Sequence, residues 1–358
     1  MASVLSGIRV IEVAQYVFVP VACGVLAEWG ADVIKVEHPV RGDAYRGLRR
    51  TANLSTEGDF NYAWQHANRG KRSVGLDLTH PEGRASLGRL LATADVLVTN
   101  LLPDSRRRVR LELEDVRRDN PQIVYARGTA LGERGPERHR GGYDHATFRA
   151  RTGSQFGATP EDASRPAPMP SGAFGDSTAG LALAGGIAAA LLQRERTGAA
   201  TTVDLSLLGM GMWSMASAIS GAMRHGEPAA KMPRVPPFNP LAGTYRTRDD
   251  RWVVLGLLQG FHQWPMLCRC LERDDWITDP RFATAEAFES NLEGVQGELE
   301  RLFASRPVDV WRRRLEGLDA VWEIVQDTLE VSSDPQAVAN GYVCLLYTSD
   351  AADDNRVV

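Results

Sequence analysis

The chain contains 358 residues, of which 43% are hydrophobic and 24% are charged, and its 41 basic and 45 acidic side chains give a net charge of −4. These values are typical of a globular protein that is long enough for more than one domain. The small negative charge argues against nucleic acid as a partner, so any anion site must be a local basic cluster.

Cysteine usage and apolar runs narrow the class of protein further. The four cysteines form no CxxC pair, which argues against a zinc site. We recognise neither a secretory leader nor an apolar run of about 20 residues, the length that a membrane helix needs. We therefore expect a cytoplasmic protein with reduced thiols and no membrane partner.

Strands and helices alternate along the first part of the chain. The predicted elements are strand 9–13, helix 20–29, strand 32–37, helix 81–94, strand 95–100, helix 111–118 and strand 122–127. This alternation is typical of a parallel sheet covered by helices on both faces. Ligands of such sheets bind beyond the carboxyl ends of the strands, so we expect binding residues in segments 14–19, 37–46 and 100–108.

A change of pattern in the second half predicts a second domain. A loop at 157–172 is followed by a buried helix at 179–194, a strand at 201–207 and an apolar helix at 208–223. Four prolines within 231–240 indicate a linker. Beyond them come an antiparallel hairpin at 243–258 and helices at 261–271, 291–304 and 308–318. We expect a large α/β domain over 1–225 with a Rossmann-like parallel sheet, a linker over 226–239 and a smaller α+β domain over 240–317.

The last 15 residues have an unusual sequence. Residues 344–358 read CLLYTSDAADDNRVV, which looks like the translation of a transposase adapter used to prepare DNA libraries. We expect this tail to be non-native and the natural sequence to differ after about Val343, so that the C-terminus is truncated.

Asp176 is the main candidate for chemistry, in the sequence FGDSTAG before the helix predicted at 179–194. An aspartate at that point commonly caps the helix by accepting hydrogen bonds from free N–H groups, a role that Ser177 or Thr178 could also fill. The same geometry suits catalysis. The amides and the helix dipole would keep the carboxylate ionised and could stabilise an oxyanion, and a carboxylate can attack an activated acyl carbon.

Other polar groups carry two interpretations each. Asp144 and His145 follow two glycines in RGGYDHATF, which indicates a tight turn that is either structural or functional. The basic groups 106–108 and 71–72 are either solvated surface charge or a grip on phosphate. The chain contains no GxGxxG, GxxxxGK[ST] or GxSxG motif, so the usual dinucleotide, P-loop and serine-hydrolase signatures are absent.

A series of longer motifs resembles a known family. From about Leu5 to Val343 the chain contains GIRVIEVAQYVFVP, GADVIKVE followed by GDAYR, NRGKRSVGLDLTHPEG, ADVLVTNLLPDS, GGYD, GDSTAG with a helix ending in RERTG, NPLAGTYRTRDDRWV and DPRF. This order and spacing resemble the family III CoA-transferases, which include formyl-CoA and carnitine CoA-transferases and are related to the α-methylacyl-CoA racemases.

The resemblance implies a reaction and its residues. Asp176 would attack an acyl-CoA thioester to form an aspartyl-acyl anhydride, and CoA would convert this into an aspartyl-CoA thioester that an acceptor carboxylic acid resolves. Asp144 would assist, without a metal. The positions that match the family's CoA contacts are Tyr16, Val17, Phe18, His38, Leu76, Asn100, Leu101 and Arg108. The resemblance also implies an interlocked homodimer and a return of the chain to the large domain that begins at about 318–343.

Two further functions stay open. Racemases of this family pair the same aspartate with a histidine at the place of Tyr143, and a phenol with a pKa near about 10 is a poor base at neutral pH. This favours transfer over 2-methylacyl-CoA racemisation. The other alternative is a catalytically inactive CoA-binding fragment. The sequence also departs from the family pattern in the bulk of Val17, Phe18 and Val19, and in His38, where arginine is frequent.

Overall fold

The computed structural model describes residues 3–51, 54–58, 60–229, 231 and 239–343. The chain divides into two compact units, one comprising Met1–Thr159 and Ser164–Ala229, the other Pro160–Ala163 and Ala230–Val343. The tail expected at 344–358 and most of the linker expected at 226–239 lie outside the described residues.

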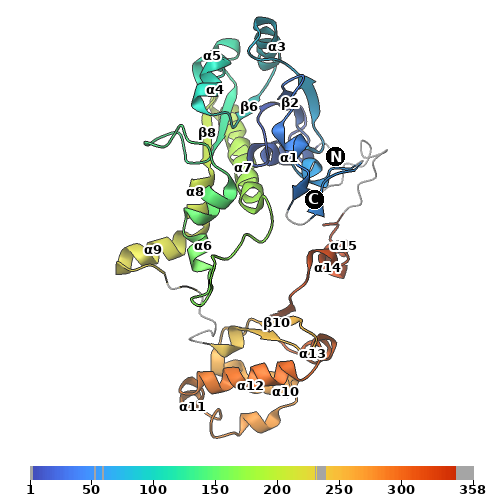
Figure 1. Ribbon diagram of the computed structural model, residues 1–358, viewed down its shortest axis with the longest axis vertical. Helices are drawn as coiled ribbons and strands as arrows, with labels where there is room; N and C mark the ends of the chain where they lie inside the picture. The colour runs from blue at the N-terminus through green and yellow to red at the C-terminus, as the bar shows by residue number, and fades with distance from the viewer. Residues whose placement is uncertain (1–2, 52–53, 59, 230, 232–238, 344–358) are drawn as a thin grey trace. The chain divides into compact units, whose positions relative to one another are not determined.

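The first unit is built on a parallel sheet of six strands, shown in Figure 1. The strands are β1 (Arg9–Val13), β2 (Asp32–Glu37), β5 (Arg72–Gly75), β6 (Val96–Thr99), β7 (Val124–Thr129) and β8 (Thr202–Ser206). Their spatial order is β5-β2-β1-β6-β7-β8, with every neighbouring pair parallel. This order matches the doubly wound dinucleotide-binding fold, in which the strand order reverses between the first and fourth strands. The expected α/β sheet is confirmed, and its switch point lies between β1 and β6.

Helices cover both faces of this sheet. α1 (Phe18–Glu28) and α7 (Phe174–Thr197) share one apolar core with β1, β6 and β7. α3 (Pro81–Leu91) and α5 (Leu113–Asp119) enclose a second core on the opposite face. α1 and α7 lie very close, because a Cβ on Gly180 would come within 2.9 Å of the carbonyl oxygen of Phe18. Glycine at this position therefore permits the contact that places the start of α7 beside the sheet.

The apolar character of α7 corrects one sequence-based statement. Phe174–Thr197 is long and apolar enough, by length and composition, to cross a membrane, although no such run was recognised in the sequence. Small residues supply much of this character, and Ala179, Leu183 and Ile187 are fully buried in the core that α7 shares with α1. Packing inside the first unit therefore accounts for the apolar composition of this helix.

The remaining elements of the first unit are short. They are β3 (Arg50–Thr51), β4 (Leu54–Ser55), α2 (Tyr62–Asn68), α4 (Pro103–Arg108), a π-helix (His145–Ala150), α6 (Ser154–Gly157), α8 (Leu207–Ser214) and α9 (Ala216–His225), with a 3-10 turn at Ala44–Gly47. The single helix expected at 208–223 is thus two helices, which meet at Met215.

The second unit contains a three-stranded antiparallel sheet, β9 (Thr244–Arg246), β10 (Trp252–Leu255) and β11 (Trp322–Ile324), in the order β11-β10-β9. This confirms the predicted hairpin. Its helices are α10 (Trp264–Cys270), α11 (Ala285–Glu289), α12 (Leu292–Ala304), α13 (Val308–Leu315), α14 (Thr328–Val331) and α15 (Pro335–Ala339), with 3-10 turns at Pro240–Ala242, Gly260–Gln263 and Asp274–Ile277. Because β11 pairs with β10, this unit extends past the boundary expected at Gly317.

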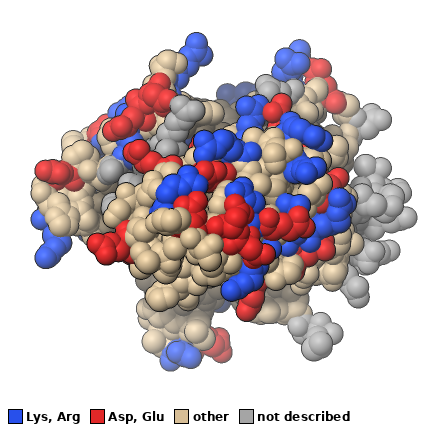
Figure 2. Space-filling view, turned by 90° about the horizontal axis from the view of Figure 1, so that it is seen from below, with Lys and Arg blue, Asp and Glu red and all other residues tan. Residues whose placement is uncertain are grey.

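Basic and acidic side chains are interspersed on the face shown in Figure 2. Ion pairs join such groups: Arg281 contacts both Asp279 at 2.7 Å and Glu298 at 3.0 Å. Mixed signs of this kind suit a surface with a small net charge.

A buried network of charges fixes the strand ends of the first unit. The Lys35 ammonium lies 2.6 Å from Glu12 and 2.9 Å from Asp43, and the Lys71 ammonium lies 2.6 Å from the other oxygen of Glu12. Burial acts to raise the pKa of Glu12, but the ammonium groups of Lys71 and Lys35 outweigh it and hold the pKa below its usual value. Asp43 also accepts the Tyr16 N–H at 3.1 Å, so the network holds the loop that follows β1.

We predict that Glu12→Gln lowers the free energy of unfolding by about 3–5 kcal/mol, because it leaves two buried ammonium groups short of a counter-charge. Urea unfolding followed by circular dichroism would measure the change. Glu195→Gln, an exposed position on α7, is the matched control and should change stability by less than about 0.5 kcal/mol. Equal effects of the two substitutions would contradict this view of the network.

Candidate active site

The loops that follow β1 and β6 meet at the switch point of the sheet. The Gln15 N–H donates to the Asn100 side-chain oxygen at 3.0 Å, and the Asn100 amide donates back to the Gln15 carbonyl at 2.6 Å. Tyr16, the next residue, has a backbone φ of 67°, a conformation that costs a non-glycine residue free energy. The Asn100 pair and the bond from Tyr16 to Asp43 together hold the loop in this shape.

Asp176 lies in the first turn of α7 and lines a cavity of about 580 Å³. Its side chain is largely buried, since the residue is only 9% exposed. The helix begins at Phe174, and its N-cap is Ala173, whose left-handed backbone has a φ of 62°. The N-cap interpretation of Asp176 is therefore wrong, because the helix starts earlier than the apolar run at 179–194 indicated.

Asp144 lies close to the first turn of α7. Its carboxylate is buried and accepts the Gly175 N–H at 3.2 Å. A Cβ on Gly175 would come within 2.5 Å of the Phe148 ring, so only glycine allows this packing. Among the described residues, Asp144 does not line the cavity that contains Asp176.

The electrostatic setting of Asp176 differs from the sequence-based expectation. Burial, and then the nearby charge of Asp144, raise the pKa of Asp176 from 3.8 to about 7. The helix amides and dipole were expected to keep this carboxylate ionised. Desolvation outweighs them here, so at neutral pH the protonated and ionised forms of Asp176 coexist.

The expected CoA-contact residues fall on two connected cavities. The cavity of Asp176 and a neighbouring one of about 470 Å³ share Gln15, Leu101 and Ser105 in their linings. Tyr16, Val17, Phe18 and Asn100 line the first, His38, Leu76 and Arg108 line the second, and Leu101 lines both. The structure thus places all eight residues in the linings of two adjoining cavities, the first of which also contains Asp176.

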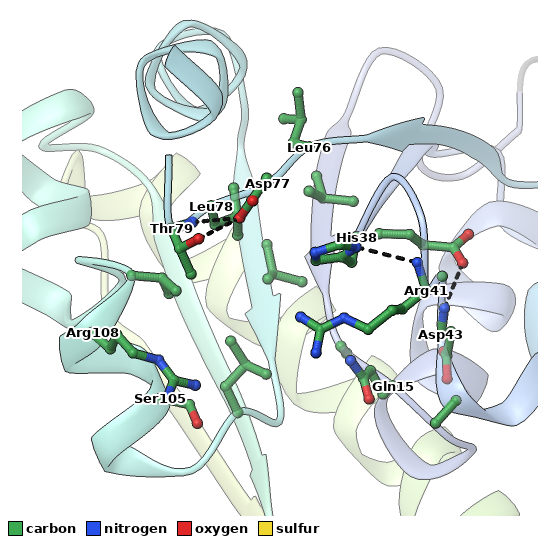
Figure 3. A pocket seen from close by; sticks show the side chains of 18 residues that line it. Gln15, His38, Arg41, Asp43, Leu76, Asp77, Leu78, Thr79, Ser105 and Arg108 are labelled. Carbon is green, nitrogen blue, oxygen red and sulfur yellow. Dashed lines mark hydrogen bonds between the residues drawn. The ribbon is translucent and has the colours of Figure 1, made fainter. Parts of the chain in front are cut away.

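The second cavity is lined by charged side chains of both signs, with Asp43 and Asp77 as well as two arginines (Figure 3). Arg108 on α4 and Arg41 in the loop after β2 point into it from opposite sides. His38 lies on the same side of the cavity as Arg41, and its Nδ1 accepts the N–H groups of Val40 and Arg41, each at 3.2 Å. Two guanidinium groups facing one space suit a phosphate ligand. Sequence reasoning did not single out Arg41, although the residue lies in the predicted binding segment 37–46.

The other basic residues noted in the sequence are engaged elsewhere. Arg106 is buried and pairs with Glu133 at 2.7 Å, and Lys71 belongs to the buried charge network. Arg107 pairs with Asp104, and Arg72 pairs with Asp32 at 2.6 Å. Of these two basic groups, Arg108 is therefore the residue that lines the second cavity.

Tyr143 and His145 line the same cavity as Asp176. The Tyr143 ring packs edge-on against the Tyr16 ring, with ring centroids 5.4 Å apart. It also stacks on the His145 ring, with centroids 6.3 Å apart. The turn predicted at RGGYDHATF thus presents aromatic side chains to the cavity and sends Asp144 into the interior.

One further polar contact fixes the first turn of α7, and no sequence pattern indicates it. His66 on α2 lies 3.0 Å from the Ser177 hydroxyl, which donates its own hydrogen to the Ala173 carbonyl at 2.8 Å. The Nε2 of His66 must then carry the hydrogen that the hydroxyl accepts. Burial and the charge of Arg69 lower the pKa of His66, which favours the neutral ring. The contact therefore ties α2 to the turn that carries Asp176.

The described residues contain no group of three His, Cys, Asp or Glu side chains placed to hold a metal ion. The expectation of a metal-free reaction stays a prediction.

Comparisons with known proteins agree on one family. The sequence profile of CoA-transferase family III matches residues 5–356; it extends into the tail and marks no boundary at Cys344. The chain is 30% identical to an (R)-2-hydroxy-4-methylpentanoate CoA-transferase from Clostridioides difficile, over 95% of this chain and 84% of that protein.

Solved structures give the same result. A crystal structure of Rv3272 from Mycobacterium tuberculosis, a probable fatty acyl-CoA transferase, matches with a TM-score of 0.79 and 31% identity, over 95% of this chain and 89% of that one. A CaiB/BaiF family protein from Brucella suis matches with a TM-score of 0.83 and 28% identity, over 98% and 94% of the two chains.

We predict a pH-dependent stability that originates at Asp176. Its pKa rises from 3.8 to about 7 on folding, so the folded chain binds more protons between these values and stability falls as pH rises through this range. Asp176→Asn cannot ionise. At pH 8 it should be more stable than wild type by up to about 4 kcal/mol, since one pKa unit corresponds to about 1.4 kcal/mol, and the difference should shrink toward pH 4.

Urea unfolding at a series of pH values would measure this difference. Asp162→Asn, at an exposed loop position, is the control and should follow wild type throughout. A difference between Asp176→Asn and wild type that is constant with pH would contradict the raised pKa.

Proposed function

This chain belongs to CoA-transferase family III and is a CoA-transferase, and from that premise we propose that it moves CoA between two carboxylic acids by way of a covalent bond to Asp176. The observation that supports the proposal is a buried carboxyl group with a pKa near neutrality that lines a cavity, next to a second cavity into which Arg41 and Arg108 point. The substrates are an acyl-CoA and a carboxylic acid.

The proposed reaction balances without an external energy source. An oxygen of Asp176 attacks the donor's thioester carbonyl, the C–S bond breaks, and CoA leaves as the thiolate. The thiolate then attacks the Asp176 carbonyl carbon of the mixed anhydride, which releases the donor acid and leaves an aspartyl-CoA thioester. The acceptor carboxylate repeats these two steps in reverse. Each intermediate is an activated acyl group, so ATP is not required.

The surroundings of Asp176 favour its acylation. Attack requires the ionised carboxylate, and a pKa of about 7 leaves a useful fraction ionised at neutral pH. Burial and Asp144 raise the free energy of that ionised form. Once Asp176 is acylated its charge is gone, and so is the repulsion from Asp144. In this proposal Asp144 acts through Asp176 and holds the Gly175 N–H, as a positioning residue.

CoA would lie along the two adjoining cavities. Its thioester would reach Asp176 in the cavity lined by Tyr16, Val17 and Phe18, and its diphosphate would lie between Arg41 and Arg108. The family more often has arginine at the position of His38. In this chain Arg41, three residues further on, supplies the cation instead. The loop held by Asn100 and Asp43 would form the wall of the passage.

We also propose an interlocked homodimer in the cytoplasm, as the family resemblance implies. Exposed apolar side chains on α8 and α9 support it, since Trp213 is 76% exposed and Met223 is 81% exposed in the single chain. Apolar groups this exposed suit burial in a subunit interface.

We predict that Asp176→Ala and Asp176→Asn reduce acyl transfer on the order of 10³-fold or more, because both remove the nucleophile. Transfer would be measured with an acyl-CoA and a panel of carboxylic acids. In the wild type, hydroxylamine should convert the intermediate into a hydroxamate on the peptide that contains Asp176. Asp162→Asn is the control and should retain activity.

Full transfer activity in Asp176→Ala would overturn the proposal. Exchange of the α-hydrogen of a 2-methylacyl-CoA with deuterated water, in the absence of an acceptor acid, would instead indicate the racemase.

A further inference from the structure

A short chain of hydrogen bonds runs from α2 to the strained residue that begins the helix of Asp176. The Nε2 of His66 lies 3.0 Å from the Ser177 hydroxyl, and this hydroxyl donates to the Ala173 carbonyl at 2.8 Å. The Ser177 N–H donates to the same carbonyl at 2.9 Å. Ala173 has a φ of 62°, a conformation that a residue with a side chain keeps only where its surroundings hold it. The bonds therefore act on the residue that sets the direction of the first turn of α7.

The helix that carries His66 is held in place by other contacts. The Asn61 side chain caps α2 by accepting the Trp64 N–H at 2.9 Å. The Arg46 guanidinium lies 3.8 Å from the centroid of the Trp64 ring. It also donates to both oxygens of Glu37, at 2.8 and 2.7 Å. α2 is thus attached to the segment after β2, and it presents the imidazole from a fixed position.

The first turn of α7 carries a group that is costly to ionise where it lies. Asp176 is 9% exposed, and burial and the charge of Asp144 raise its pKa to about 7. Burial, and then the charge of Asp176, raise the pKa of the nearby Tyr45 phenol, which therefore stays neutral at pH 7 and offers no counter-charge. A turn that was free to shift would let the ionised carboxylate move toward water, where its charge is better solvated. Contacts that hold the turn oppose this movement.

We propose that His66 is a positioning residue for Asp176: through Ser177 it holds the first turn of α7, so that the carboxylate stays in place at the cavity when it ionises. The kinetic consequence rests on the proposed function, whereas the hold itself can be measured without a substrate. Among the described residues, His66 lines neither of the two adjoining cavities. It should therefore affect the rate of the chemical step and leave the binding of CoA unchanged.

Carbon NMR of protein labelled with ¹³C in its aspartate carboxyl groups tests the hold directly. The resonance that is missing from Asp176→Asn identifies Asp176, and its titration gives the pKa. We expect His66→Leu to lower this pKa by at least about one unit, toward 3.8, because the carboxylate can then move toward water. His66→Gln should keep the wild-type pKa, since its amide can donate the same hydrogen bond to Ser177.

Steady-state kinetics measure the consequence, with the acyl-CoA and acid pair that wild type transfers fastest in the panel above. His66→Leu should reduce kcat about tenfold and leave the KM for the acyl-CoA unchanged, because a small misplacement of a reacting group costs rate. His66→Gln should retain the wild-type kcat. Ser177→Ala should have the same effect as His66→Leu, and the double variant should lose no more than either single one.

Gln65→Leu is the matched control. Gln65 precedes His66 on α2 and, within the described part of the chain, lines neither cavity, so its variant should have the pKa and the kcat of wild type.

Either an unchanged pKa of Asp176 or an unchanged kcat in His66→Leu would overturn the assignment and leave the proposed function standing. Equal losses in His66→Leu and His66→Gln would do the same, because the ring and not its hydrogen bond would then matter, and so would losses that add in the double variant. A wild type that transfers no CoA would refute the proposed function instead, and the titration would still decide whether His66 holds the turn.

Discussion

Two carboxyl groups buried on either side of one glycine are the constraint on which the site depends. Asp144 accepts the Gly175 N–H and Asp176 is the next residue, so two acids share an apolar region in which both cannot easily be ionised. The Phe148 ring packs against Gly175, and His66 contacts the Ser177 hydroxyl. The first turn of α7 is thus held by three contacts, and the acid that lines the cavity has a pKa of about 7.

The position of this turn follows from the topology of the sheet. The strand order of the parallel sheet reverses between β1 and β6. The loops that follow these two strands diverge there and leave a hollow. Asn100 joins the two loops, and the network around Glu12 holds the β1 loop through Asp43. Buried charges and a strained Tyr16 are costly, and they occur where the chain must form a wall for a ligand.

Much of the first unit could be predicted from the sequence, because buried parallel strands such as VLVT of β6 are short apolar runs between helical patterns. β5 was missed because its sequence, RSVG, is largely exposed at the sheet edge. Motif resemblance led to Asp176, Asp144 and Arg108. The pKa of Asp176, the turn of Arg41 into the cavity and the His66–Ser177 contact were beyond prediction, since each depends on tertiary packing between segments that are distant in sequence. The second unit's extension to β11 likewise depends on a strand pairing across about 70 residues.

The most direct test of covalent participation by Asp176 follows an oxygen atom. In the proposed reaction the donor acid leaves with one oxygen of the Asp176 carboxylate, and the acceptor acid replaces it. Turnover with an acceptor labelled with ¹⁸O in its carboxylate should therefore transfer the label to Asp176, and mass spectrometry of the peptide containing this residue should show the mass increase. Continued transfer of CoA with no label in that peptide would contradict a covalent role for Asp176.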